Sequence, residues 1–196
     1  GRSSKVRPRF RARVTWRPLN NLTLVGRYEY QLSTVNTTPD PLSGLGETES
    51  AKLTSHIVAF NASWAPWSRL YVQAGINYVN SGLETPAQDF TAAVLEAQNN
   101  YWSVNLNTGL VLDDKTDLNL GYTYYRADNY VDNSALSQPF GAGAEEHAIT
   151  ATLIHRFSKS ILGKLTYGYF CNNDQTYGGH NEYDAHMVYS SLQYRF

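Results

Sequence analysis

Sustained alternation of apolar and polar residues constrains the fold of this chain more than any other feature of its sequence. The segment KVRPRFRARVTW at 5–16 opens the pattern. One side of an extended strand would carry Val6, Pro8, Phe10, Ala12, Val14 and Trp16, and the other Arg7, Arg9, Arg11, Arg13 and Thr15. A period of two predicts a β-strand with two different faces, whereas a DNA-binding helix would space its arginines three and four residues apart.

The alternation recurs in a series of hairpins. After the turn RPLNN, a second strand sets Leu22, Leu24, Gly26, Tyr28, Tyr30 and Leu32 against Thr23, Val25, Arg27, Glu29 and Gln31. Further hairpins are predicted at a proline turn after Trp64, at 113–116 and at 158–160, followed by a last strand at 184–196. Long polar segments at 33–51, 80–99, 127–145 and 172–182 connect them, and FTAAVLEAQ at 90–98 is one candidate short helix. Short turns at one end and long loops at the other indicate an all-β, antiparallel up-and-down barrel.

Composition excludes several other classes of protein. The formal net charge of -1 argues against a nucleic-acid-binding protein, because the basic residues near the start are a local feature. The single cysteine, Cys171, excludes an intramolecular disulfide and a cysteine-based zinc site. No apolar stretch reaches the roughly 18 residues that a membrane-spanning helix needs.

The composition of the two strand faces separates a membrane barrel from a soluble sandwich. A soluble sandwich would present a richly charged outer face. The second faces of the middle strands instead carry small neutral polar residues: Ser103, Asn105, Asn107, Asn119, Gly121, Thr123, Thr150, Thr152 and Thr166. We therefore expect a wet lumen on this side and lipid on the other, with strands of about ten to thirteen residues crossing the bilayer at a tilt. Glycines within strands, such as Gly109 and Gly121, indicate bending or close packing.

The strand count predicts that further strands precede this chain. About nine strands are expected, whereas single-chain bacterial barrels usually have an even number. We therefore expect residues 1–196 to be a single β-barrel domain, the C-terminal portion of a longer chain.

Charged residues on the second face are the candidate functional residues. We expect the lumen to be lined by Arg7, Arg9, Arg11, Arg13, Arg27, Glu29 and Lys164. The arginines could make a pore favour anions or contact an acidic partner. Alternatively, they could pair with carboxylates on a neighbouring strand outside this chain.

The histidines do not form a clear metal site in the sequence. His180 and His186 with Asp184 are the best candidates, although scattered structural or interfacial roles fit the five histidines better. A hydrolase would need a nucleophile or a water-activating carboxylate beside a histidine. Asp184 and His186 alternate onto one strand face, but no second acidic pair accompanies them. We predict no enzyme activity, metal or cofactor.

The ending VYSSLQYRF at 188–196 resembles the C-terminal strand of bacterial outer-membrane β-barrel proteins. The resemblance implies that Leu192, Tyr194 and Phe196 form the signal read by the barrel assembly machinery. YDAHMVYSSLQYRF and the tyrosine-rich GYTYYRADN are also similar to barrels that sheath multihaem cytochromes, the MtrB/PioB type. None of the matched residues is a haem ligand.

These patterns together predict a bacterial outer-membrane barrel that acts as a passive pore for small polar solutes. One alternative is a scaffold that encloses a multihaem cytochrome for electron transfer across the outer membrane, and a less favoured one is an outer-membrane hydrolase. The expected partners are outer-membrane lipid, the barrel assembly machinery, and a periplasmic or lumenal protein such as a multihaem cytochrome. Nucleic acid is not an expected partner.

Overall fold

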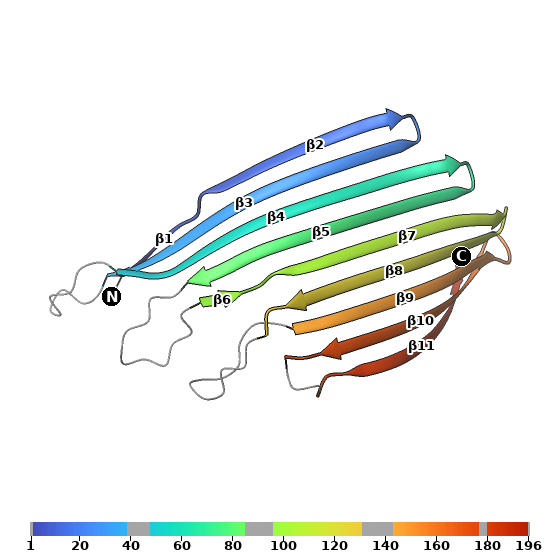
Figure 1. The fold of residues 1–196 in the computed structure, drawn as a ribbon. Coiled ribbons are helices and arrows are strands. Elements are labelled where there is room, and N and C mark those ends of the chain that lie inside the picture. Colours follow the sequence, from blue (N-terminus) through green and yellow to red (C-terminus); the bar gives the residue numbers. More distant parts are fainter. Residues whose placement is uncertain (1, 39–47, 85–95, 131–142, 177–179, 196) are drawn as a thin grey trace.

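A computed structural model describes residues 2–38, 48–84, 96–130, 143–176 and 180–195. They form one antiparallel sheet (Figure 1). Its strands are β1 (Arg2–Val6), β2 (Arg9–Leu19), β3 (Leu22–Thr38), β4 (Thr48–Trp67), β5 (Leu70–Glu84), β6 (Glu96–Gln98), β7 (Tyr101–Asp113), β8 (Thr116–Asp128), β9 (Gly143–Arg156), β10 (Ile161–Asp174) and β11 (Tyr183–Tyr194).

The sheet has nine strand positions, in the order β1-β3-β4-β5-β7-β8-β9-β10-β11, as the sequence predicts. β1 and β2 share one position, because both pair with β3 in one continuous register that is interrupted at Arg7 and Pro8. Proline has no N–H to donate to the ladder, although the Pro8 carbonyl still accepts from the Leu32 N–H at 3.1 Å. β6 and β7 likewise pair with β5 in one register.

Three sequence predictions are wrong in detail. The helix expected at 90–98 is contradicted at Glu96–Gln98, which is strand β6, and the rest of that segment lies outside the described residues. β4 does not end at Trp64, because it continues through Pro66 to Trp67. β3, β4 and β5 are also longer than predicted, at 17, 20 and 15 residues, and extend into the segments expected to be loops.

Three of the short hairpins contain a register shift close to the turn. In each, the first strand holds one more residue than its partner. The extra residue lies between Trp16 and Leu19 in β2, between Trp64 and Trp67 in β4, and between Val111 and Asp113 in β7. Such a β-bulge changes which side chains lie opposite each other. The shift aligns the polar positions of the two strands on the same face.

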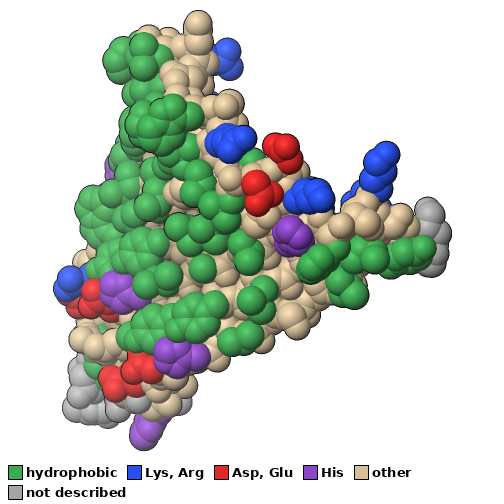
Figure 2. All heavy atoms as spheres, turned by 90° about the vertical axis from the view of Figure 1, so that its right-hand side faces the viewer, with side chains coloured by type: hydrophobic (Ala, Val, Ile, Leu, Met, Phe, Trp, Pro, Cys, Tyr) green, Lys and Arg blue, Asp and Glu red, His purple; other side chains and the backbone are tan. Residues whose placement is uncertain are grey.

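Strand pairing confirms the two predicted faces. The polar face carries Arg11 opposite Glu29 and Asn107 opposite Gly121, whereas the apolar face carries Leu106 opposite Tyr122. The apolar face is uncovered by other described residues, and Figure 2 shows hydrophobic side chains gathered along the outer margin of the curved sheet. No second sheet packs on it within the described part of the chain, so a soluble sandwich is excluded there.

The sheet has almost no hydrophobic core. The buried hydrophobic residues among those described are Ala59, Val79 and Ala127, and pairing places all three on the polar face. No helix in the described part of the chain is long and apolar enough to cross a membrane. The sheet is open, with β1 and β2 at one edge and β11 at the other.

Candidate functional site

The polar face is the candidate functional site, because it gathers the predicted lumen residues. Register places Arg9, Arg11 and Arg13 on β2 beside Gln31, Glu29 and Arg27 on β3, respectively. Arg7 lies at the interruption between β1 and β2. Lys164 lies on the same face near the other edge of the sheet. It is exposed on β10, opposite Ile154 of β9 and Ser191 of β11.

Glu29 is the centre of an ionic cluster on this face. Its side chain is only 2 % exposed, and it is the largest fully buried side chain of those described. Arg11 Nε donates to Glu29 Oε2 at 2.9 Å, while Arg9 and Gln31 both donate to Oε1. Three donors therefore surround one carboxylate, the arrangement that a buried charge requires.

The cluster changes the interpretation of the arginines near the start of the chain, Arg7, Arg9, Arg11 and Arg13. Arg9 and Arg11 pair with a carboxylate inside the chain, not with one on a strand beyond it as one alternative supposed. Arg13 and Arg27 lie opposite each other, and neither they nor Arg7 forms an ion pair with any residue that the structure describes. The exposed cationic charge of this region therefore comes mainly from Arg7, Arg13 and Arg27.

The middle strands of the polar face are neutral. Some polar side chains are paired across strands: Ser55 and Ser81 share a hydrogen bond of 2.7 Å between β4 and β5, and Asn77 donates to Ser103 at 3.2 Å between β5 and β7. The surface crossed by β4, β5, β7 and β8 is thus hydrophilic without carrying net charge along its central length. This matches the composition that the sequence predicts for a wet lumen.

The apolar face holds a repeated tyrosine–histidine arrangement that the sequence analysis missed. A hydrogen bond joins a Tyr hydroxyl to His Nδ1 in Tyr28–His56 at 2.9 Å, Tyr122–His147 at 3.0 Å and Tyr167–His186 at 2.8 Å. The tyrosine two residues further along packs on the same histidine, with ring centroids 5.0, 5.0 and 5.1 Å apart for Tyr30, Tyr124 and Tyr169. The available signal was a Tyr-x-Tyr on one strand followed by a histidine on the next.

Two of the three candidate metal and hydrolase residues, Asp184 and His186, belong to this arrangement. The Tyr169 hydroxyl donates to Asp184 at 2.9 Å, and His186 bonds to Tyr167, so each is engaged by a different tyrosine. Both lie on the apolar face, away from the lumen residues. Across the described ranges, no group of three His, Cys, Asp or Glu side chains is placed to hold a metal ion. His180 is exposed beyond the end of β10.

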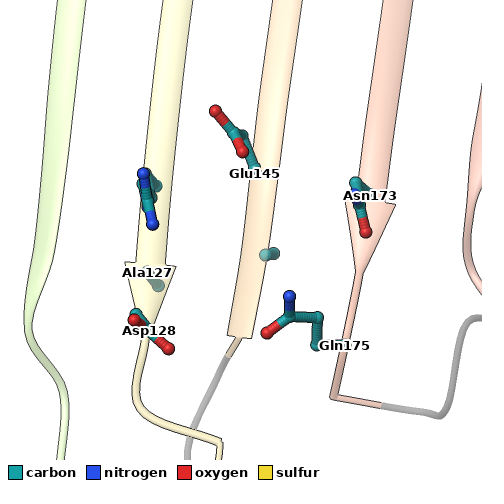
Figure 3. Close-up of a pocket in the computed structure, with 7 residues that line it drawn as sticks. Ala127, Asp128, Glu145, Asn173 and Gln175 are labelled. Carbon is teal, nitrogen blue, oxygen red and sulfur yellow. The ribbon is translucent and has the colours of Figure 1, made fainter.

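A small charged hollow lies at the loop end of β8, β9 and β10. Figure 3 shows Asp128, Glu145 and Asn173 on three neighbouring strands around it, with Gln175 below. Its volume of about 60 Å³ has room for little more than water. It therefore offers no solute site.

Two of the three residues predicted to form the assembly signal lie in the C-terminal strand, β11. Leu192 and Tyr194 lie on the apolar face and are 73 % and 59 % exposed. Phe196, the third residue of the predicted signal, lies outside the described residues.

No family model matches this chain, and no curated protein matches it either. Several solved structures match it. The chain is similar to the copper transporter OprC, with a TM-score of 0.60 at 12 % identity, over 97 % of this chain and 33 % of that one. It is also similar to the outer-membrane transporter YddB from Escherichia coli, with a TM-score of 0.59 at 10 % identity, over 96 % of this chain and 31 % of that one.

The chain therefore spans about a third of the length of the solved structures it resembles. At such identities the likeness concerns the fold alone. It agrees with the sheet topology, the short turns at one end and the exposed apolar face. The fold is that of a bacterial outer-membrane β-barrel protein, present here as an open antiparallel sheet.

Proposed function

We propose that this chain forms part of the wall of a bacterial outer-membrane β-barrel that lets small polar solutes pass passively. The observation that carries the proposal is the reversed burial of the sheet. Its apolar side chains are exposed and its buried side chains lie on a hydrophilic face. Lipid on one side and water on the other accounts for both.

A pore requires that the sheet close. β1 and β2 at one edge and β11 at the other present unpaired backbone groups in the described part of the chain. In lipid each unpaired N–H or C=O costs several kcal/mol, so an open sheet is not stable there. We infer that these residues are one domain and that further strands complete the barrel.

The cationic end of the polar face supports a preference for anions. Glu29 neutralises part of the charge of Arg9 and Arg11, and Arg13 and Arg27 are exposed on the same face without an ion pair to any described residue. A cationic wall raises the local concentration of anions. The neutral middle strands add no opposing charge.

The test is conductance of the full-length protein in planar bilayers. We expect stable ion conduction, and a lower anion-to-cation permeability ratio when Arg13 and Arg27 are both replaced by glutamate. Lys159→Glu is the matched control, because Lys159 is an exposed residue of the short turn between β9 and β10. A folded protein without conductance would contradict the passive pore, and an unchanged permeability ratio would remove the role of these arginines.

Partners follow from the same surfaces. Outer-membrane lipid would cover the apolar face, and the barrel assembly machinery would read Leu192, Tyr194 and Phe196. The alternative scaffold would enclose a periplasmic or lumenal protein such as a multihaem cytochrome. Haem absorbance in the purified native complex, together with absent conductance, would favour that alternative.

The hydrolase alternative has less support. Asp184 and His186 are each bound to a tyrosine on the apolar face, away from the polar face, and the free thiol of Cys171 lies opposite Asp184 on that same apolar face. Loss of a measurable hydrolysis in His186→Ala would be the result that favours it.

A further inference from the structure

A neutral hollow interrupts the polar face near the short-turn end of β5, β7, β8 and β9. Its volume is about 260 Å³. Its lining on the polar face is formed by Tyr71, Asn107, Gly109, Asn119, Gly121, Thr150 and Thr152, of which Thr152 is already hydrogen-bonded to Thr166. Register places all of them on the polar face, so the hollow opens toward the proposed lumen.

Two glycines create the hollow. A Cβ atom at Gly121 would lie 2.6 Å from Thr150 Oγ1 and 3.4 Å from Asn107 Oδ1. At Gly109 it would lie 3.2 Å from Asn119 Oδ1. Polar side chains from neighbouring strands therefore lie against the backbone of the two glycines, which have no side chains of their own. This is the close packing that the sequence predicts for these glycines.

The polar groups of the hollow have free hydrogen-bonding capacity. Some hydroxyls and amides elsewhere on this face are paired with one another, as in Asn77–Ser103 at 3.2 Å. Within the part of the chain that the structure describes, no side-chain hydrogen bond engages Asn107, Asn119 or Thr150. An amide both donates and accepts hydrogen bonds, and a hydroxyl does the same. The hollow can therefore bind groups that have both capacities.

The absence of charged side chains in the hollow disfavours ionic ligands. None of its lining side chains is charged. The nearest acid along β8, Asp117, is bound to Arg156 Nη2 at 2.7 Å. An anion would find no cation here and a cation no anion, so neither would be compensated for lost hydration.

Tyr71 supplies an apolar surface in the hollow. It lies opposite Gly109, so no side chain of β7 stands across from it, and 43 % of the residue is exposed. An exposed aromatic ring offers an apolar surface next to polar groups. A sugar ring, which has C–H groups on its faces and hydroxyl groups around its edge, matches that combination.

We propose that this hollow is a binding subsite for neutral polyhydroxylated solutes, of the size of one or two sugar rings. The proposal rests on the proposed pore and names a class of solute for it. It also separates two regions of the lumen wall, because anions would gather at Arg13 and Arg27 on the far side of β4.

The test measures sugar binding directly, by saturation-transfer NMR of maltose with the full-length protein in detergent micelles. We expect saturable binding, weakened at least tenfold when Asn107 and Asn119 are both replaced by leucine. Asn61→Leu is the matched control, because it makes the same change on the polar face outside the hollow. The control should bind as the wild type does.

Conductance separates failure of the subsite from failure of the pore. If maltose does not bind, or binds equally well to the double variant, the subsite is wrong whether or not the protein conducts ions. If maltose binds and the double variant loses it, the subsite stands even where no conductance is seen, and only the passive pore fails. Circular dichroism of each variant establishes that the strands are intact.

Discussion

The two faces of the sheet are organised in the opposite sense to the inside and outside of a water-soluble protein. On the polar face Glu29, Ser55 and Ser81 are buried. On the apolar face Trp16 is 62 % exposed and Leu106 is 40 % exposed. Curvature of the sheet crowds the side chains of the concave face, and these are the hydrophilic ones (Figure 2).

This difference means that the medium on each side, more than the depth of burial, decides which residue types are used. A large exposed apolar surface on a soluble monomer is an aggregation hazard. The same surface is required when hydrocarbon covers it. The same substitution made on opposite faces should therefore change the free energy of unfolding by very unequal amounts.

The largest expected difference comes from introducing arginine. Leu106→Arg puts a charge on the apolar face in the middle of β7, and we expect a loss of about 2–4 kcal/mol in the free energy of unfolding. Gln73→Arg puts the same side chain on the polar face of β5, where water solvates it, and we expect little change. Urea unfolding of the full-length protein in lipid vesicles measures both. Equal losses at the two positions would contradict the assignment of the faces.

Much of the fold is predictable because β-structure has a period of two. The faces of β2 and β3, the short turns and the nine strand positions all follow from alternation. The lengths of β3 and β4 do not follow, because their outer ends carry polar residues that resemble a loop. Proline after Trp64 suggests a turn, whereas the structure accommodates it in a bulge near the end of β4.

The candidate site was only partly predictable, because contacts depend on register. A simple two-residue turn pairing Leu19 with Leu22 would set Arg11 opposite Tyr30. The bulge after Trp16 shifts the pairing by one residue, so that Arg11 lies opposite Glu29. The sequence did contain a signal, because polar positions of both strands are odd-numbered and can share a face only if the register shifts. The neutral hollow depends on side chains from four strands, which alternation alone does not bring together.

The second difference concerns charge on the polar face itself. Glu29→Gln leaves Arg9 and Arg11 without their carboxylate, and we expect a loss of about 1.5–3 kcal/mol, the range for hydrogen bonds to charged groups. Asp117→Asn also removes a carboxylate bound to arginine, but the side chains of that pair are 48 % and 23 % exposed. Its loss should stay below about 1 kcal/mol. Urea midpoints of the two variants compare them, and similar values would mean that burial of Glu29 adds nothing.

The smallest expected difference concerns neutral hydrogen bonds on the two faces. Tyr122→Phe removes the hydroxyl that bonds to His147 on the apolar face, and Thr152→Val removes the hydroxyl that bonds to Thr166 on the polar face. Water can replace the lost partner only on the polar face. We expect a loss of about 0.5–1.5 kcal/mol for Tyr122→Phe and less for Thr152→Val. Unfolding of both variants in the same vesicles gives the comparison, and a larger loss for Thr152→Val would show that the tyrosine–histidine pairs are as well hydrated as the lumen wall.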